Sequence, residues 1–504
     1  MIASFFSCDA LSSHAHNLYP PIVANVSQRK ARHRARLATL KAAGIIQTGF
    51  VMQTAGHKFK LFAAASAAML ALAAACAPEA PAPEVVEAPA APAVADPAVS
   101  SITMAADPAA LGFDAAIFAK AKADLEADVK AGKIPGAVLL IAKGGQVVDV
   151  TAVGTEGPGD ADPMSAETIF RIYSMTKPIT SIATMQLVEE GKIALEDPIS
   201  KYIPEFANPK VLEADGKTTR PATREITVRD LLSHESGLIY GVFAQPEDPL
   251  GKLYMAAGDT RFDFTALDLS KAIAGLPLAF DPGTAWNYSR STDVLGAVIE
   301  VASGKPLDVL FNEKIFTPLG MDDTHFYLEA DEANRLAEPP TTLKAPLSEP
   351  KTMQPMFSGG GGLNSTTEDY FRFVEMLRGK GEYRGVRIVK PETLDAMLVD
   401  QIGPNVDRKA WFYGPLGGFG LGFGLLPIDM ADPAKGNVFS WSGYAGTNMW
   451  VDPKNDITMV FMIQNNEASA DYPMKLRQWV YGGYKDPAAT PAAPAPAAPA
   501  APAQ

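Results

Sequence analysis

Serine and lysine three positions apart can act as a nucleophile and its base. On a helix this spacing places both side chains on one face, one turn apart. A neutral lysine can then accept the serine proton while the hydroxyl attacks a carbonyl carbon. The 504-residue chain contains three such pairs, Ser27/Lys30, Ser174/Lys177 and Ser348/Lys351. The motif therefore predicts acyl transfer at whichever pair lies on a helix.

Only the second pair, Ser174 and Lys177, lies where a helix is expected. Three prolines within residues 346–355 surround the third pair and interrupt a regular helix. After Lys177, apolar residues recur at helical spacing as far as Gly191. Pro178 is tolerated in the first turn, where backbone amides have no intrahelical acceptor. We expect Ser174 to open this helix, where the helix dipole favours developing negative charge.

Other hydrolytic chemistries are not indicated. The main block contains two isolated histidines, His234 and His325, which make a poor metal site. Gly-x-Ser-x-Gly, His-Glu-x-x-His and phosphate-loop motifs are absent from the sequence. Cys8 and Cys76 are the only cysteines, which excludes a disulfide framework, a cysteine-rich zinc site and a cysteine nucleophile in the block. We expect no metal and no organic cofactor.

Composition excludes two further classes of protein. Hydrophobic residues make up 47% of the chain, which excludes wholesale disorder. The net charge of −13 disfavours nucleic-acid binding.

The elements around the serine–lysine pair read as an α+β domain over residues 108–485. Strands at both ends of this block, with helices between them, indicate one antiparallel sheet built from both termini. Gly144-Gly145 supplies the positive φ angles of a tight hairpin between the first two strands. The spacing predicts helices over 113–131 and 474–482, and strands over 137–142, 147–153, 437–441, 448–451 and 457–463.

The N-terminal segments differ from this block. Residues 1–51 form a basic extension with six lysines and arginines and one acid. Such an arm could touch nucleic acid or membrane, but we favour a start codon assigned too early. Residues 52–76 resemble a signal peptide, because a short basic start precedes an apolar run that is too short to span a membrane.

The end of that signal peptide indicates a lipid anchor. Ala73-Ala74-Ala75-Cys76 is similar to a bacterial lipoprotein cleavage box, in which Cys76 is lipidated. Ordinary signal cleavage and an uncleaved anchor are the alternatives. We expect an exported, periplasm-facing lipoprotein, in the outer membrane of a Gram-negative bacterium. Residues 77–107 form an Ala/Pro-rich linker, and residues 486–504 a disordered Ala/Pro tail.

Several further stretches of the block resemble one family, in the expected order. They are LEDPISKYIPEF at 195–206, LLSHESGL at 231–238, Pro282-Gly283-Thr284, Tyr288-Ser289, Pro318–Met321 and Gly359–Gly362. With Ser174–Lys177, they resemble the serine β-lactamase and penicillin-binding-protein superfamily, and most of all the class C β-lactamase-like hydrolases and family VIII carboxylesterases. The resemblance implies an antiparallel sheet flanked by helices, an all-helical lobe, and an active site between them.

The resemblance assigns roles to the second motif of the family, Tyr-x-Asn. Tyr288 takes the place of the tyrosine, which in the family shares the general-base role with the lysine. As a phenolate near a cation, it could accept the serine proton. Arg290 replaces the asparagine that usually binds a substrate amide, so we expect Arg290 to contact the substrate. The following residues, 291–300, are similar to those of family VIII carboxylesterases.

The third motif of the family, Lys-Thr-Gly, aligns with Trp441-Ser442-Gly443. The usual cation helps to bind a substrate carboxylate, whereas Trp441 offers an apolar surface and one N–H. We expect these three residues to contact the substrate, although Trp441 could simply be a packing residue. By analogy with the family, the backbone amides of Ser174 and Tyr444 form the oxyanion hole.

Other residues of this region have plainer interpretations. We expect His234, in LLSHESGL, to be structural rather than catalytic. The Gly359–Gly362 and Gly417–Gly424 runs do not precede helices as phosphate loops do, so we expect them to mark close backbone approach or strand edges. Four aromatic residues could line an acyl pocket or belong to the core: Trp411, Phe412, Tyr413 and Phe419.

These observations predict a serine hydrolase that acts on small-molecule carboxylic esters through a Ser174 acyl-enzyme, with Lys177 and Tyr288 as the base pair. Two alternatives stay open. One is a β-lactamase or D-alanyl-D-alanine carboxypeptidase-like enzyme of peptidoglycan. The other is a non-catalytic sensor of cell-wall fragments or β-lactams. We expect no nucleic-acid partner, and membrane contact only through the N-terminal lipid.

Overall fold

The computed structural model describes residues 102–413, 416–429 and 431–487. The predicted basic extension, signal peptide and lipidation site Cys76 lie outside the described residues, as does the segment after residue 487. No helix within the described ranges is both long and apolar enough to cross a membrane.

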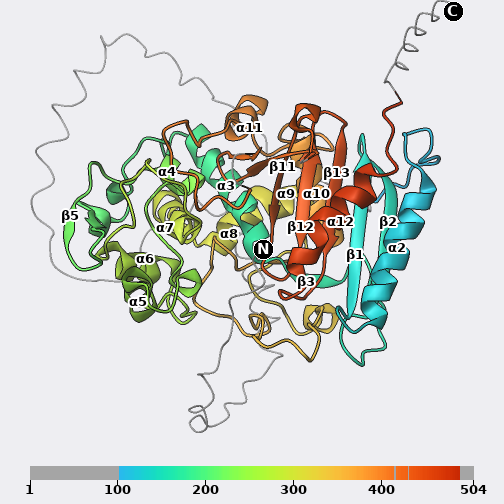
Figure 1. Ribbon diagram of the computed structural model, residues 1–504, viewed down its shortest axis with the longest axis horizontal. Helices are drawn as coiled ribbons and strands as arrows, with labels where there is room; N and C mark the ends of the chain where they lie inside the picture. The colour runs from blue at the N-terminus through green and yellow to red at the C-terminus, as the bar shows by residue number, and fades with distance from the viewer. Residues whose placement is uncertain (1–101, 414–415, 430, 488–504) are drawn as a thin grey trace, which may run out of the picture. The chain divides into compact units, whose positions relative to one another are not determined.

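A seven-stranded antiparallel sheet forms the centre of the described fold, in the order β2-β1-β13-β12-β11-β10-β9 (Figure 1). The first and last strands in sequence meet inside it, because β1 pairs with β13. This confirms the prediction of one sheet built from both termini. The strands are β1 (Gly136–Lys143), β2 (Gln146–Gly154), β9 (Gly418–Phe419), β10 (Gly424–Pro427), β11 (Asn437–Ser442), β12 (Asn448–Asp452) and β13 (Ile457–Met462).

The predicted hairpin joins β1 to β2. Gly144 and Gly145 have φ angles of 58° and 79°, in the left-handed region that glycine adopts without a steric penalty. The tight turn requires both angles, so the two glycines set the register of the pair that leads the sheet.

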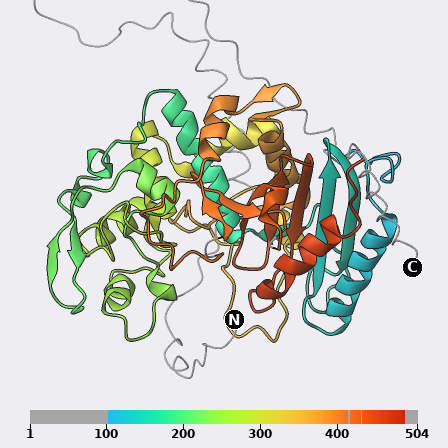
Figure 2. The same ribbon diagram turned by 45° about the horizontal axis from the view of Figure 1, so that its top comes forward.

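Helices cover both faces of the sheet. Alternate side chains of β1 and β13, such as Leu139 and Phe461, pack against α2 (Ala115–Lys130) and α12 (Tyr472–Tyr481). These two helices lie side by side on one face in both views (Figures 1 and 2). The intervening side chains belong to a second hydrophobic cluster with α3 (Thr176–Glu189) and α10 (Thr367–Arg378). The sheet is therefore buried on both faces, and α3 belongs to the hydrophobic cluster on the face opposite to α2 and α12.

A lobe made mostly of helices follows α3 in the chain, shown in green to the left of the sheet in Figure 1. It contains α4 (Val228–Ser233), α5 (Pro249–Ala256), α6 (Ala266–Ala274), α7 (Ser291–Ser303) and α8 (Leu307–Phe311). The lobe also carries a hairpin of β4 (Lys210–Leu212) and β5 (Thr219–Pro221), which corrects the expectation of an all-helical lobe. Asp215 and the left-handed Gly216 supply the turn that closes this hairpin.

Short elements complete the described chain. They are β3 (Ile169–Arg171) with β6 (Asn364–Thr366), β7 (Glu382–Tyr383) with β8 (Val386–Arg387), α9 (Thr317–Leu319) and α11 (Pro391–Met397). The β3–β6 pair matters most for function, because β3 leads directly to Ser174 and β6 follows the Gly359–Gly362 run.

Candidate active site

Ser174 lies on a short turn between β3 and α3. It belongs to a 3₁₀ turn, η1 (Tyr173–Met175), and the α-helix begins at Thr176. The prediction that Ser174 opens the α-helix is therefore wrong by one short turn. Pro178 explains the difference, because it has no N–H to donate to the Ser174 carbonyl. Tyr173 has a φ of 43°, a strained angle for a non-glycine residue just before the nucleophile.

The structure brings Ser174, Lys177 and Tyr288 together, as the motifs predicted. The Tyr288 hydroxyl donates to Ser174 Oγ over 2.6 Å, and Lys177 Nζ lies 3.3 Å from the same oxygen. Tyr288 comes from the loop before α7, so the group spans the lobe and the helix under the sheet. Ser174 Oγ thus lies between two groups that can exchange protons with it.

Lys177 is buried, with 1% of its surface exposed, and its amine has three polar neighbours. Besides Ser174, it contacts the Gly360 carbonyl at 2.6 Å and the Tyr240 hydroxyl at 3.0 Å. Burial lowers the pKa of Lys177 to about 7, although Asp293 opposes the shift. A neutral amine can donate its two hydrogens to Gly360 and Tyr240, which directs its lone pair toward Ser174.

Tyr240 is a site residue that the sequence analysis missed. It directly precedes the 3₁₀ turn η4 (Gly241–Phe243) in the lobe. Burial raises the pKa of its hydroxyl well above the ordinary value, so the group stays neutral and can accept from Lys177. Its position two residues after LLSHESGL was the only available signal, because neither residue type nor spacing sets Tyr240 apart from other tyrosines.

The Tyr288 hydroxyl is also neutral. Burial raises its pKa far above the ordinary value, and this outweighs the lowering effect of its bond to Ser174. The interpretation of Tyr288 as a resting phenolate is therefore not supported. Of the two groups beside Ser174, Lys177 is the one whose pKa suits a base at neutral pH.

His234 supports Tyr288 from behind. It ends α4 in the left-handed conformation, with a φ of 60°, and its ring centroid lies 4.9 Å from that of Tyr288. Its Nδ1 lies 3.3 Å from Ser289 Oγ. Burial lowers the pKa of His234 well below its ordinary value, so the ring is neutral. These contacts agree with the structural role expected for it.

Trp441 and Gly443 occupy the edge of the site formed by β11. The Trp441 ring centroid lies 5.6 Å from that of Tyr288, and the Trp441 side chain interacts with the Tyr288 hydroxyl, which opposes the rise in the pKa of Tyr288. A Cβ atom on Gly443 would lie 2.4 Å from the carbonyl oxygen of Ile172, which only glycine avoids. Gly443 therefore lets β11 approach the turn that carries Ser174. Ser442, the last residue of β11, is exposed.

The expected oxyanion-hole amides lie on the two segments that Gly443 brings together. Within the described ranges, neither the Ser174 nor the Tyr444 backbone N–H donates a hydrogen bond. The Tyr444 side chain is 44% exposed, and its ring packs edge-on against Tyr173 at 5.5 Å. Both amides are thus open to a ligand, and their oxyanion role stays a prediction.

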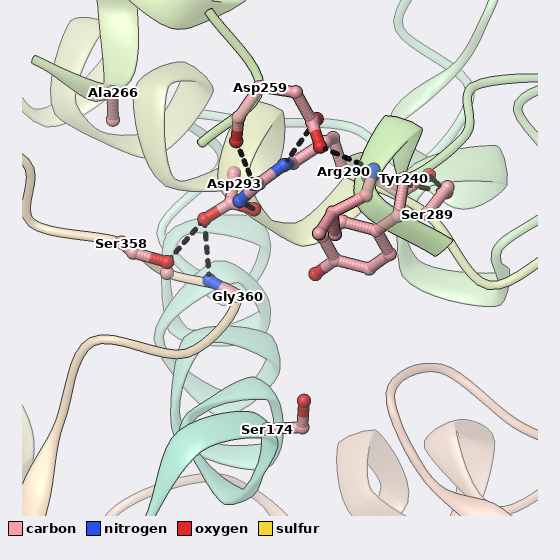
Figure 3. A network of polar contacts seen from close by, with 12 residues as sticks. Ser174, Tyr240, Asp259, Ala266, Ser289, Arg290, Asp293, Ser358 and Gly360 are labelled. Atoms are coloured by element: carbon pink, nitrogen blue, oxygen red, sulfur yellow. Dashed lines mark hydrogen bonds and ion pairs between the residues drawn. The ribbon is translucent and has the colours of Figure 1, made fainter. Parts of the chain in front are cut away.

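Arg290 does not point to the substrate as we expected. Its side chain is 14% exposed and turns into the lobe, where Nε donates to Asp259 at 2.8 Å and a terminal nitrogen to Asp293 at 3.1 Å (Figure 3). The guanidinium carbon lies 4.7 Å from the Tyr240 ring centroid. Two buried carboxylates bind the guanidinium at the same time, so Arg290 is engaged within the lobe. This corrects the assignment of Arg290 as a substrate ligand.

The aromatic residues separate into core and surface. Trp411 and Phe419 are buried, and each packs within 6 Å of Trp286. Phe412 is 54% exposed, and its ring centroid lies 5.6 Å from that of Tyr288. Phe412 is therefore the member of this group that is open to solvent beside Tyr288, whereas Trp411 packs behind it and Phe419 packs on Trp441. Tyr413 packs on Trp411.

Comparison with known proteins agrees with this fold and site. The family model described as Beta-lactamase matches residues 121–480. Esterase EstB of Burkholderia gladioli is 30% identical over 408 residues, covering 74% of this chain and 98% of its own. Protein Rv1367c of Mycobacterium tuberculosis is 36% identical over 354 residues, covering 66% and 87%. Among solved structures, the hydrolase EstCE1 superposes with a TM-score of 0.62 at 30% identity, covering 73% of this chain and 99% of its own.

The chain belongs to the beta-lactamase family. It is a serine hydrolase of that family, and esterases are among its relatives. The resemblance stated from the motifs is confirmed, and so is the fold class, a sheet flanked by helices with a predominantly helical lobe. The alternative of a non-catalytic sensor is not supported.

Proposed function

We propose that the protein hydrolyses carboxylic esters of short-chain or bulky hydrophobic acids through an acyl-enzyme on Ser174. The observation that carries the proposal is the placement of Ser174 Oγ between the Tyr288 hydroxyl at 2.6 Å and the Lys177 amine at 3.3 Å. A buried amine with a pKa of about 7 is partly neutral at physiological pH and can accept the serine proton.

Acylation uses both neighbours of the serine. Ser174 Oγ attacks the ester carbonyl while its proton passes to Lys177, and the backbone amides of Ser174 and Tyr444 bind the developing oxyanion. The neutral Tyr288 hydroxyl donates a proton to the departing alkoxide and regains one from Lys177. The alcohol leaves, and the serine is esterified. Deacylation repeats these transfers with water as the nucleophile, which releases the acid and restores Ser174.

The surroundings of Ser174 favour an apolar acyl group. Trp441 stands where related enzymes of cell-wall chemistry carry a cation, and Phe412 adds a half-exposed aromatic face. Arg290 cannot replace the missing cation, because Asp259 and Asp293 hold its guanidinium. These features support an esterase over the alternative of a β-lactamase or D-alanyl-D-alanine carboxypeptidase. The similarity to Esterase EstB supports the same assignment.

A comparison of two substrates tests the proposal. Purified protein is assayed with p-nitrophenyl butyrate and with a chromogenic cephalosporin, and Ser174→Ala serves as the blank. We expect kcat/KM for the ester to exceed that for the cephalosporin by at least about 100-fold, and Ser174→Ala to reduce ester turnover at least about 10³-fold. Faster cephalosporin turnover, or an active Ser174→Ala variant, would refute the proposal.

We also propose, from the sequence alone, that the protein is exported and lipidated at Cys76 in a periplasm-facing membrane. The motif around Cys76 and the apolar run before it support this proposal. Mass spectrometry of the mature N-terminus tests it. A diacylglyceryl-modified Cys76 is expected, and a mature chain that begins elsewhere or carries an unmodified Cys76 would contradict it.

A further inference from the structure

Asp293 binds the backbone of Gly360, whose carbonyl in turn accepts a hydrogen bond from Lys177. This buried carboxylate accepts hydrogen bonds from the Ser358 hydroxyl at 2.5 Å and from the Gly360 N–H at 3.1 Å (Figure 3). The carbonyl of the same Gly360 accepts from Lys177 Nζ. A Cβ atom at position 360 would lie 2.7 Å from an Asp293 oxygen, so the glycine permits the approach. Asp293 thereby fixes the acceptor that orients the lysine.

This arrangement creates an electrostatic conflict. A carboxylate in a buried region stabilises the protonated form of a nearby lysine, which could not act as a base. Asp293 does raise the pKa of Lys177, in opposition to burial. The carboxylate that positions Lys177 therefore also works against its function unless a positive charge offsets it.

Arg290 supplies the positive charge next to Asp293. It donates to Asp293, and both its charge and its bond hold the pKa of Asp293 below the ordinary value. It also lowers the pKa of Lys177. Asp259, whose side chain is fully buried, orients Arg290 through its carboxylate and its backbone carbonyl. The other carboxylate oxygen of Asp259 accepts from the Val242 N–H at 3.1 Å, which fixes the pair within the lobe.

Apart from Asp259, which is paired with Arg290, the other titratable side chains around Lys177 carry no charge near neutral pH. The Tyr240 and Tyr288 hydroxyls are neutral because burial raises their pKa. His234 is neutral because burial lowers its pKa. Besides burial, which has the largest effect, Asp293 and Arg290 are the charged groups that shift the pKa of Lys177, Asp293 upward and Arg290 downward.

We propose that Arg290, oriented by Asp259, is a positioning residue whose charge offsets that of Asp293 and so helps burial to keep Lys177 in its neutral, proton-accepting form. The inference rests on the proposed function in so far as Lys177 is the base for Ser174. It explains why an arginine occupies the third position of Tyr288-Ser289-Arg290 without facing the substrate. Asp293 fixes the geometry around the lysine, and Arg290 offsets part of the negative charge that comes with it.

The test measures how fast Ser174 reacts with a fluorophosphonate probe as a function of pH. The probe forms a bond from phosphorus to Ser174 Oγ and releases fluoride, while the serine proton passes to Lys177. Because no ester is needed, the rate reports the protonation of Lys177 independently of the natural substrate. In the wild type we expect the labelling rate to rise with pH and to reach half of its alkaline plateau near pH 7, the pKa of Lys177. This pH is called the half-point below.

Arg290→Gln removes the charge and keeps a polar side chain. We expect its half-point to rise by about one pH unit, so labelling at pH 7 slows about fivefold and recovers at about pH 9.5. Arg290→Lys keeps the charge, and its half-point should stay near that of the wild type. Asp293→Asn should shift the half-point in the opposite direction, to lower pH. Arg220→Gln breaks an arginine–aspartate pair elsewhere in the lobe and serves as the matched control.

The double variant Arg290→Gln/Asp293→Asn removes both charges and should return the half-point toward that of the wild type. A loss in Arg290→Gln that is equal at every pH, with an unchanged half-point, would overturn the inference and leave Arg290 a structural residue. If Arg290→Gln does not fold, an unshifted half-point in Asp293→Asn overturns it equally. Wild-type labelling with a half-point near 7 but without ester turnover would refute the proposed ester substrate alone.

Discussion

Tyr240→Phe isolates the hydroxyl that the sequence did not single out. The change removes the acceptor 3.0 Å from Lys177 Nζ and keeps the aromatic ring against which Arg290 and Phe243 pack. A buried N–H that loses its acceptor costs about 1–3 kcal/mol. The cost applies to the conformation in which the lysine lone pair points to Ser174. A loss of about 1–3 kcal/mol there lowers kcat/KM about 5- to 150-fold.

The same change also affects the pH profile. Protonated Lys177 has three hydrogens to donate and the neutral amine two, so loss of an acceptor destabilises the protonated form more. The pKa of Lys177 should therefore fall below its present value of about 7. Activity depends on the neutral amine, so the acid limb of the profile should move to lower pH while the plateau drops.

The assay is kcat/KM for p-nitrophenyl butyrate between pH 5 and pH 9. Tyr254→Phe is the matched control, because Tyr254 is a buried tyrosine of the same lobe whose hydroxyl interacts with the Ile239 backbone and not with Lys177. We expect the control to keep wild-type activity. A Tyr240→Phe enzyme with a wild-type plateau and an unshifted acid limb would refute the reasoning about the lone pair.

Three more predictions concern the same site. The Lys177→Met variant should lose turnover. It also removes a lysine whose pKa is about 7 in the folded protein, against an ordinary value of 10.5. The unfolded wild type binds more protons between these values, so wild-type stability rises with pH there. The stability of the variant relative to wild type should therefore fall by roughly 2–3 kcal/mol from pH 6 to pH 9, measured by urea unfolding. Gly443→Ala places a methyl 2.4 Å from the Ile172 carbonyl and should destabilise the protein by about 1–3 kcal/mol. Trp441→Ala should raise KM for hydrophobic esters about tenfold with less change in kcat.

Contrary results would be informative. A pH-independent stability difference for Lys177→Met would mean that the lysine is charged in the folded protein. A wild-type free energy of unfolding for Gly443→Ala would mean that β11 does not approach Ile172 as closely as described. An unchanged KM for Trp441→Ala would make Trp441 a packing residue.

The sequence predicted the parts of the fold that local pattern determines. Strands β1 and β13 are runs of apolar residues, and in the helices that cover them apolar residues recur with a 3.6-residue period. The sequence therefore predicted both the strands and the helices. Helix α2 begins two residues later than expected because Asp114 caps it, and α12 begins two residues earlier. The β4/β5 hairpin was not predicted, because its three-residue strands are too short for a periodic signal.

The catalytic group was predictable for a related reason. Ser174 and Lys177 are three residues apart on one turn, and Tyr288 lies in a motif of its own. Their placement is confirmed in that the three polar groups meet, whereas their catalytic roles stay a proposal. Tyr240 was not predictable, because its contact with Lys177 depends on how the lobe folds across 63 residues of sequence separation.

Arg290 shows why a residue's place in a motif does not settle its role. The expectation of a substrate ligand assumed that a polar residue two positions after Tyr288 faces the site. A guanidinium is long and always charged, and in a buried region it turns toward whatever carboxylate can pair with it. Asp293 is three residues along α7, but Asp259 is 31 residues away, across a turn of the lobe that no local pattern reveals. With both carboxylates in place, the Arg290 charge that we expected to face a ligand lowers the pKa of Lys177 instead. In our proposal the nucleophile is therefore controlled, through Lys177, by a residue whose ion pairs are with Asp259 and Asp293 and not with Ser174.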